Sequence, residues 1–293
     1  MATALHEGET MTWAAEFEAA QRSRAANIVC MKWGTLYGPE WVNKLYGGVT
    51  RNTTWKTRFI CLTDDATGIR SEVECLPLPP LTLNTGGSAL RRGITLGTEG
   101  ASDPWWNKMS AFRETLHDLS GMTLYLDLDI LIVGNIDAMF AHPGRFCMMQ
   151  IWRAERFAQP IGNSSVVRFF IGHEKKTFEK FVSQPFSVIQ KQYNGSQQRF
   201  LSANAEELSF FPVDWCVSFK DCLPRNWIIR YFSKPTYPQR AKLVVFYGPH
   251  TPQAAINGEL AAVKKKKGLR RWMLALFKKR FRPAAWIAQN WIE

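Results

Sequence analysis

Short apolar runs alternate with a helical pattern in the first part of the chain. The runs that we expect to form strands cover residues 27–33, 58–63 and 73–76. A helical pattern extends from Glu40 to about Val49, and Pro39 stands just before it, where its fixed φ suits the start of a helix. Strand, helix and strand at this spacing predict a parallel β-sheet and therefore an α/β fold.

A further apolar strand is expected near the middle of the chain. It covers residues 122–126, runs into Asp127-Leu-Asp129 and continues over 130–133, so we place the centre of the sheet there. The other expected elements are a mobile surface loop at 82–104, a helix at 105–119, a strand at 147–151, helices at 175–182 and 187–193, and a strand at 242–246.

The charge of the chain is concentrated in one segment. The 293 residues are 46% hydrophobic and 21% charged, as in ordinary globular proteins, and the formal net charge is +12. Ten of the 37 bases and none of the 25 acids lie in residues 264–282, which leaves 27 bases against 25 acids elsewhere. A nearly neutral body argues against a broad basic face, so no nucleic-acid partner is expected.

Cysteine usage and the N-terminus favour a cytoplasmic location. The six cysteines are scattered and form no CxxC pair, so we expect buried thiols in a reducing compartment, with a pairing of Cys216 or Cys222 as the alternative. The first residues include acids and contain no continuous apolar run of the length that a signal peptide needs.

The residues that point to chemistry are Asp127 and Asp129. Side chains two apart on an extended chain point to the same face, so both carboxylates could reach one site. Mn²⁺ or Mg²⁺ prefers oxygen ligands and is commonly held by one or two carboxylates together with substrate phosphates. A cation held there could neutralise a nucleotide-diphosphate leaving group.

A purely structural role for these two aspartates stays open. Aspartate pairs occur by chance and often simply end a strand or form a turn. However, two like charges in an apolar run cost several kcal/mol unless something positive compensates them, and no base stands next to them in the sequence. A metal ion would supply that compensation.

A longer stretch resembles the glycogenin and bacterial lipopolysaccharide galactosyltransferase families. It comprises Lys108-Met-Ser-Ala-Phe112 and Leu124-Tyr-Leu-Asp-Leu-Asp-Ile-Leu-Ile-Val-Gly-Asn-Ile-Asp137. In those families a lysine on a preceding helix, an aspartate–any–aspartate motif and a following Asn-Ile-Asp recur in this order. The resemblance implies a GT-A fold with a nucleotide-sugar donor, and it implies retention of the anomeric configuration.

The resemblance also implies roles for four further residues. Tyr37, in Val29-Cys-Met-Lys-Trp-Gly-Thr-Leu-Tyr37, would stack on the nucleotide base, and Lys108 would neutralise the diphosphate. Asn163 begins the segment 163–166, which is similar to the family's Asn-Ser-Gly. Gln197 ends the segment 193–197, which is similar to the family's Gly-Asp-Gln. Both residues would contact the donor sugar. The alternatives are core packing for Tyr37 and a solvated helix position for Lys108.

Two departures from the family pattern concern the reacting groups. Ser196 stands where the family usually has an aspartate before the glutamine. The late His-Gly-x-x-Pro segment reads Phe246-Tyr-Gly-Pro-His-Thr-Pro252, so either His250 has taken the metal-ligand role from a shifted position or the third protein ligand is missing. A loop histidine without a ligand role is the alternative for His250.

The basic segment near the C-terminus has the pattern of an interfacial helix. Apolar residues at helical spacing face bases on the opposite side, and Trp286 and Trp291 add aromatic anchors. We therefore expect residues 264–282 to hold the chain on an anionic membrane surface as a peripheral protein. The alternative is a helix packed on the body, with its bases solvated.

The sequence thus predicts three parts and one function. They are an N-terminal extension at 1–25, a GT-A domain at 26–262 and a basic amphipathic tail at 263–293. The expected activity is the transfer of a hexose from a nucleotide-diphosphate sugar, with uridine as the expected base, to a saccharide or lipid-linked acceptor. The alternatives are a non-catalytic protein of the same fold and a sugar nucleotidyltransferase.

Overall fold

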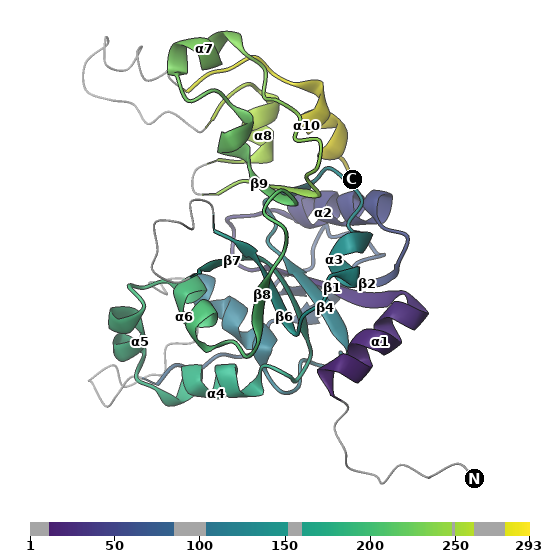
Figure 1. Cartoon of the computed structure of the whole chain (residues 1–293), viewed down its shortest axis with the longest axis vertical. Coiled ribbons are helices and arrows are strands. Elements are labelled where there is room, and N and C mark those ends of the chain that lie inside the picture. Colours follow the sequence, from purple (N-terminus) through teal and green to yellow (C-terminus); the bar gives the residue numbers. More distant parts are fainter. Residues whose placement is uncertain (1–11, 85–103, 152–159, 248–249, 261–278) are drawn as a thin grey trace.

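The computed structural model describes residues 12–84, 104–151, 160–247, 250–260 and 279–293. Its centre is a seven-stranded sheet in the order β3-β2-β1-β4-β7-β6-β8 (Figure 1). The strands are β1 (Ala25–Lys32), β2 (Lys56–Thr63), β3 (Glu74–Pro77), β4 (Met122–Leu126), β6 (Phe146–Gln150), β7 (Gly162–Phe170) and β8 (Leu208–Phe210).

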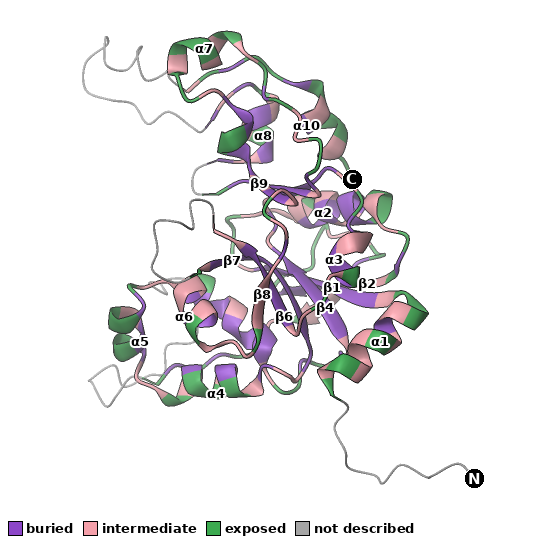
Figure 2. Cartoon of the chain, in the orientation of Figure 1, coloured by how far each residue is buried: buried purple, intermediate pink, exposed green. Residues whose placement is uncertain are grey.

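Most neighbouring strands of this sheet are parallel. β3, β2, β1 and β4 run in one direction, β7 is antiparallel to both β4 and β6, and β8 is parallel to β6. The α/β class with a mostly parallel central sheet is therefore confirmed. The sequence did not predict β7, which lies beside β4 and is buried along its whole length (Figure 2).

Helices cover the two faces of the sheet. The helices on one face are α1 (Trp13–Ser23), α2 (Pro39–Asn52) and α3 (Asp137–Ala141). The helical segments on the other face are the 3-10 helix η1 (Pro104–Phe112), α4 (Lys175–Ser183), α5 (Phe186–Gln192) and α6 (Gln197–Asn204). The expected helix at 105–119 is thus shorter than predicted. The segment 82–104, expected to be a loop, lies largely outside the described residues.

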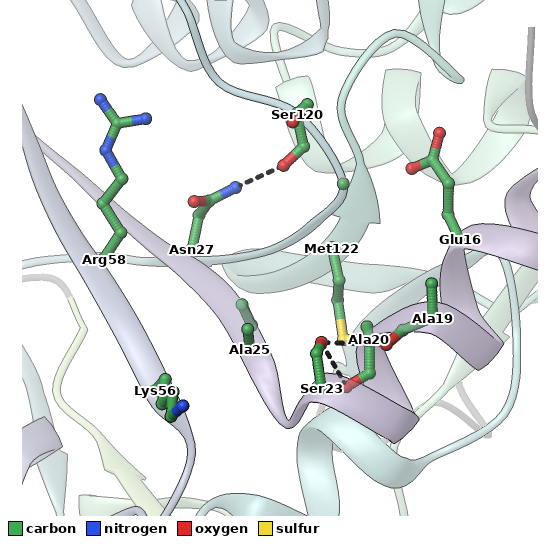
Figure 3. A pocket seen from close by; sticks show the side chains of 12 residues that line it. Glu16, Ala19, Ala20, Ser23, Ala25, Asn27, Lys56, Arg58, Ser120 and Met122 are labelled. Atoms are coloured by element: carbon green, nitrogen blue, oxygen red, sulfur yellow. Dashed lines mark hydrogen bonds between the residues drawn. The ribbon is translucent and has the colours of Figure 1, made fainter.

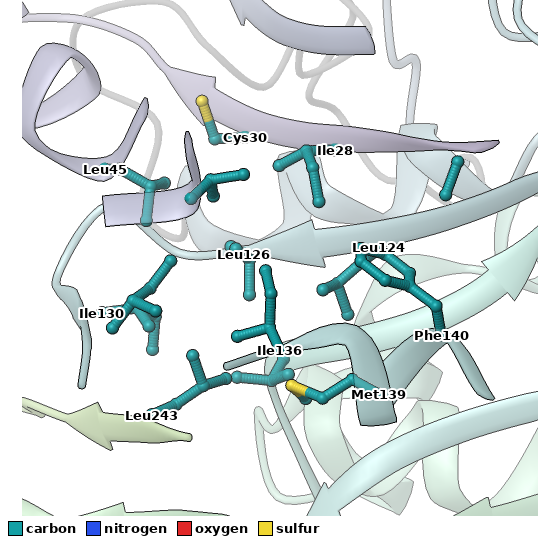
Figure 4. Packing of buried hydrophobic residues seen from close by; sticks show 14 of the residues in the cluster. Ile28, Cys30, Leu45, Leu124, Leu126, Ile130, Ile136, Met139, Phe140 and Leu243 are labelled. Carbon is teal, nitrogen blue, oxygen red and sulfur yellow. The ribbon is translucent and has the colours of Figure 1, made fainter. Parts of the chain in front are cut away.

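The strand pattern explains how the sheet is anchored around β4. Leu124 and Leu126 of β4 pack with Ile28 and Cys30 of β1 against Leu45 of α2 (Figure 4). Because successive side chains of a strand alternate between its faces, the same strands supply a second apolar layer on the other face. Burial on both faces is typical of the central strands of an α/β sheet.

A smaller layer covers the end of the sheet where β4 finishes. Its strands are β5 (Ile130–Ile132), β10 (Leu243–Val245) and β9 (Cys216–Ser218), in that order. Its helical segments are η3 (Phe219–Cys222), α7 (Trp227–Phe232), α8 (Pro252–Ile256) and α10 (Ala285–Asn290), at the upper end of Figure 1.

The end of the chain packs on the body, which corrects part of the expected tail. Trp291 is 4% exposed and its ring lies 5.4 Å from that of Trp41, while the Trp286 indole N–H donates to the Pro235 carbonyl at 3.0 Å. The Arg51 guanidinium donates to the main-chain oxygens of Ile292, at 2.8 Å, and Glu293, at 3.1 Å. Trp291 is therefore a core residue and not a membrane anchor. Removing its apolar ring from water stabilises the folded chain.

The N-terminal boundary also differs from the sequence prediction. Residues 13–23, expected to be part of an extension, form α1, whose N-cap Thr12 accepts a hydrogen bond from the Ala15 amide at 3.3 Å. α1 packs against β1 and β4, and Ala20 is buried there. The basic helix expected at 264–282 lies mostly outside the described residues.

Candidate active site

Asp127 and Asp129 lie on a tight turn between β4 and β5. The Ile130 amide donates to the Asp127 carbonyl at 3.3 Å, so the chain turns here and is not extended as the sequence predicted. The turn is held from both sides, since the Asp127 amide donates to the Ser165 carbonyl at 2.9 Å and the Phe246 amide to the Asp129 carbonyl at 3.4 Å. Both carboxylates thus occupy the carboxyl end of a central strand, where α/β sheets bind ligands.

Among the described residues, Lys108 provides the positive charge that pairs with this turn. Its ammonium lies 2.6 Å from the Asp127 carboxylate oxygens, and the two side chains are only 13% and 20% exposed. The alternative of a solvated helix lysine is therefore wrong. The Tyr125 hydroxyl also donates to Asp127, at 3.2 Å. The sequence interpretation missed Tyr125, although its spacing of two residues from Asp127 could have indicated the contact.

Asp129 has no comparable partner in the described part of the chain. Burial and, to a smaller extent, the negative charge of Asp127 raise the pKa of its carboxyl to about 8, although Lys108 acts in the opposite direction. One ammonium thus faces two carboxylates. A pair of oxygen-donor groups with too little positive charge around it fits a hard divalent cation such as Mn²⁺ or Mg²⁺.

Tyr37 lies in the loop between β1 and α2, close to both carboxylates. Its half-buried ring packs edge-on against Trp41, with centroids 4.7 Å apart. Burial raises the pKa of the Tyr37 hydroxyl, and the charges of Asp129 and then Asp127 raise it further. The structure therefore brings Tyr37, Lys108 and the two aspartates together.

Asn163 lies on β7, which pairs with β4, and Gln197 is the first residue of α6 and is hydrogen-bonded to β7. The Ser164 hydroxyl donates to Gln197 Oε1 at 2.9 Å, and the Ser165 amide donates to Asn163 Oδ1 at 2.8 Å. Gln197 Nε2 faces the Met109 sulfur at 3.7 Å, a weak acceptor, next to Lys108 in the chain. Gln197 and Asn163 are 4% and 5% exposed, so they are held in defined orientations.

Ser196 has a local structural role. It is the N-cap of α6, and its hydroxyl accepts a hydrogen bond from the Arg199 amide at 3.4 Å. Serine and aspartate are both favoured at N-caps. The serine at this position therefore keeps the helix start that precedes Gln197.

His250 lies in the segment that follows β10. Its ring Nδ1 contacts the Leu260 carbonyl, the side chain is 9% exposed, and burial lowers its pKa. Within the described residues, no group of three or more His, Cys, Asp or Glu side chains could hold a metal ion. The ligand role of His250 stays a prediction, with Nε2 as the atom that could serve it.

A cavity of about 290 Å³ lies at the amino ends of the strands, opposite the end at which Asp127 and Asp129 lie (Figure 3). It is lined by the amino ends of β1, β2 and β4, among them Asn27, Lys56 and Met122. Arg58 of this cavity is already paired with Glu74 and Asp118. None of the expected site residues lines this cavity.

Comparison with known proteins supports the fold. No protein-family model and no curated protein matches the chain. It is similar to the solved structure of the galactosyltransferase LgtC in complex with donor and acceptor sugar analogs, with a TM-score of 0.50 and 12% identity over 90% of this chain and 99% of that one. An active-site mutant of LgtC gives a TM-score of 0.51 and 12% identity over 89% and 98%. The chain thus has the GT-A fold.

None of the described helices is long and apolar enough to cross a membrane.

Proposed function

We propose that the chain is a metal-dependent glycosyltransferase that moves a hexose from a nucleotide-diphosphate sugar to a saccharide or lipid-linked acceptor. Uridine is the proposed base. The observation that carries this proposal is the pair Asp127 and Asp129 at the end of the central strand of a GT-A sheet, where Lys108 is the one base that pairs with them among the described residues. The likeness to LgtC, whose complex holds donor and acceptor sugar analogs, supports the same reaction class.

Asp127 and Asp129 would hold the Mn²⁺ or Mg²⁺ ion. When bound, such an ion neutralises charge on the diphosphate as it leaves. Lys108 would share this task, because its ammonium is a compact charge that can turn from the Asp127 carboxylate to a phosphate oxygen. Tyr37 would offer its ring to the base from the loop after β1.

Asn163 and Gln197 would orient the donor sugar. Both lie on elements adjacent to the turn, and a serine holds the amide oxygen of each. The Gln197 amide nitrogen contacts only the weak acceptor sulfur of Met109, so it would exchange that contact for a sugar hydroxyl group. Transfer would proceed with retention. We assign no nucleophile.

The enzyme would work at the cytoplasmic face of a membrane. The basic residues 264–282 provide attraction to anionic lipid. Ile228, Ile229 and Phe232 of α7 support this placement, because they are 52%, 56% and 62% exposed on one short helix. Residues 222–247 around them contain five bases and no acid.

Two alternatives rest on specific features. A non-catalytic protein is favoured by the Lys108–Asp127 ion pair, which occupies a carboxylate that a metal would need. A sugar nucleotidyltransferase also uses paired carboxylates, but no Gly-rich phosphate loop with a basic residue follows the first strand.

Product analysis distinguishes these functions. The protein is incubated with a panel of nucleotide sugars and Mn²⁺, and separately with nucleoside triphosphates and sugar phosphates. Release of a nucleoside diphosphate and a free or transferred hexose supports the proposal. Release of pyrophosphate favours the nucleotidyltransferase, and the absence of both products favours the non-catalytic protein.

A further inference from the structure

The loop that carries Tyr37 enters α2 without a side-chain cap. The N-cap residue is Gly38, which makes no side-chain hydrogen bond, and Pro39 follows it at the start of the helix. Many helices begin with a side chain that accepts from the first amides, and this one does not. Instead, the Tyr37 ring packs on Trp41 in the first turn, with centroids 4.7 Å apart. An apolar contact across a helix start fixes the angle at which the chain enters the helix.

Trp41 is in turn held by the last residues of the sequence. Trp291 is 4% exposed, and its ring meets that of Trp41 edge-on, with centroids 5.4 Å apart. This is one of the geometries that aromatic pairs prefer. The ammonium of Lys44, also on α2, lies 5.7 Å from the centre of the Trp291 ring. The ring contacts therefore run from Trp291 through Trp41 to Tyr37.

The segment that carries Trp291 is fixed on α2 by its main chain. The Arg51 guanidinium donates to the main-chain oxygens of Ile292 and Glu293. Gly47 is the point of closest approach, because a Cβ there would lie 2.5 Å from the main-chain carbon of Glu293 and 2.9 Å from the Ile292 oxygen. Only a residue without a side chain allows this approach. Figure 1 shows α10 and the last residue beside α2.

The other end of the row of rings lies at the candidate active site. Burial and the charges of Asp129 and then Asp127 raise the pKa of the Tyr37 hydroxyl, so the ring lies within reach of both charges. Leu36, the preceding residue, is 82% exposed, so its side chain does little to hold the loop. Among the described residues, Trp41 is the one aromatic ring that packs on Tyr37.

We propose that Trp291 is a positioning residue, which holds Tyr37 in its orientation at the donor site through Trp41. This inference rests on the proposed function, in which Tyr37 meets the nucleotide. Without the Trp291 ring, Trp41 loses a packing partner and Tyr37 loses a fixed support. Nucleotide binding would then have to order both side chains, which weakens the affinity.

A double-mutant cycle on nucleotide affinity tests the inference. UDP is titrated calorimetrically in Mn²⁺ onto the full chain, Trp291→Ala, Tyr37→Ala and the double variant, at a temperature at which all are folded. We expect Trp291→Ala to weaken UDP binding by about three- to tenfold. In the Tyr37→Ala background it should have no further effect, because it acts through that ring. Trp291→Phe, which keeps an aromatic ring, should lose less.

Trp55→Ala is the matched control. Trp55 is 6% exposed and stacks on Phe140 with centroids 4.8 Å apart, and it stands just before the amino end of β2, away from the candidate site. The substitution removes the same ring from the core, so it measures the effect of lost packing alone. UDP affinity should be unchanged in this variant.

The orientation of Tyr37 is also followed without nucleotide. In protein labelled with fluorotyrosine, the fluorine NMR resonance that is missing in Tyr37→Phe belongs to Tyr37. We expect this resonance to shift or broaden in Trp291→Ala and to keep its position in Trp55→Ala.

Three results would overturn the inference. They are an equal loss of UDP affinity from Trp291→Ala with and without the Tyr37 ring, an equal loss in Trp55→Ala, and a Tyr37 resonance that does not respond to Trp291→Ala. If the unmodified protein bound no UDP in Mn²⁺, the proposed function would fail, while the fluorine resonance would still decide whether Trp291 positions Tyr37.

Discussion

The ammonium of Lys108 lies 2.6 Å from the carboxylate of Asp127, and this ion pair links η1 to the turn after β4. Both side chains are largely buried, so their attraction is little screened by water. The pair explains how an apolar strand can end in two carboxylates before any metal is bound. It also means that Lys108 and a metal ion would compete for Asp127.

A Lys108 variant tests the ion pair with Asp127 and the metal site at Asp127 separately. Lys108→Met leaves Asp127 without its cation, and the free energy of unfolding in metal-free buffer should fall by about 2–3 kcal/mol. Mn²⁺ should restore most of that loss, because the ion replaces the missing charge. Thermal unfolding with and without Mn²⁺ measures both, with Lys44→Met on α2 as the control. Equal destabilisation with and without Mn²⁺ would contradict a metal site at Asp127.

Ser196 tests whether the departure from the family pattern matters for the fold. Ser196→Ala removes the N-cap of α6 and should lower the free energy of unfolding by about 1 kcal/mol, whereas Ser196→Asp should preserve it. Denaturant unfolding of the two variants provides the comparison. If both variants were equally stable, the cap at Ser196 would contribute nothing measurable.

Glu174 should make stability depend on pH. Its side chain is buried beside Arg145, and burial raises the pKa of the carboxyl from 4.5 to about 7. The folded protein therefore holds a proton that the unfolded chain releases, so this stabilisation is complete below about pH 4.5 and is lost as the pH rises to about 7. The total change should be on the order of 3 kcal/mol.

Glu174→Gln is the matching variant, because its amide cannot ionise. Chemical denaturation between pH 4.5 and 8 should show a smaller decrease in stability for this variant than for the unmodified protein. Glu18→Gln, a change at an exposed carboxylate, serves as the control. A slope that is unchanged in Glu174→Gln would place the titrating group elsewhere.

The exposed side of α7 should contribute to membrane binding. Substituting Ile228, Ile229 and Phe232 together by serine removes apolar surface that could enter the lipid interface, and should weaken binding at least tenfold. Cosedimentation with phosphatidylcholine vesicles, with and without phosphatidylserine, measures this. Val188→Ser on α5, a half-exposed position far from α7 in Figure 1, is the control. Vesicle binding that is unaffected by the triple substitution, or that does not increase with phosphatidylserine, would contradict membrane binding through α7 and the basic residues.

The sequence predicted the centre of the fold well because its signals there are local. The strand at 122–126 was predicted with its observed bounds, and the helix after Pro39 begins at that proline. Both segments combine an uninterrupted apolar or amphipathic pattern with a clear break. Motif and family resemblance led to the expected site residues Tyr37, Lys108, Asp127 and Asp129; the fold brings them together, and their roles stay predictions.

The sequence did not reveal β7, because its polar residues hide its burial. Asn163 and Arg168 are 5% and 0% exposed, and the Arg168 guanidinium finds acceptors that only the tertiary structure provides. Arg168 donates to the carbonyls of His142 and Gly144, which lie more than twenty residues away in the chain. Similarly, the apolar tail position Trp291 matches an interfacial anchor as well as a core residue, and only its contact with Trp41 decides between them.

The most direct test of the central claim is the metal-dependent release of nucleoside diphosphate from a panel of nucleotide sugars. The unmodified protein is compared with Asp127→Asn, Asp129→Asn and the control Asp214→Asn, a carboxylate paired with Arg240 outside the site. We predict turnover of one donor that requires Mn²⁺ or Mg²⁺, falls at least a hundredfold in the first two variants and persists in the control. Turnover that survives in both site variants, or no turnover and no metal-dependent nucleotide binding in the unmodified protein, would contradict the account.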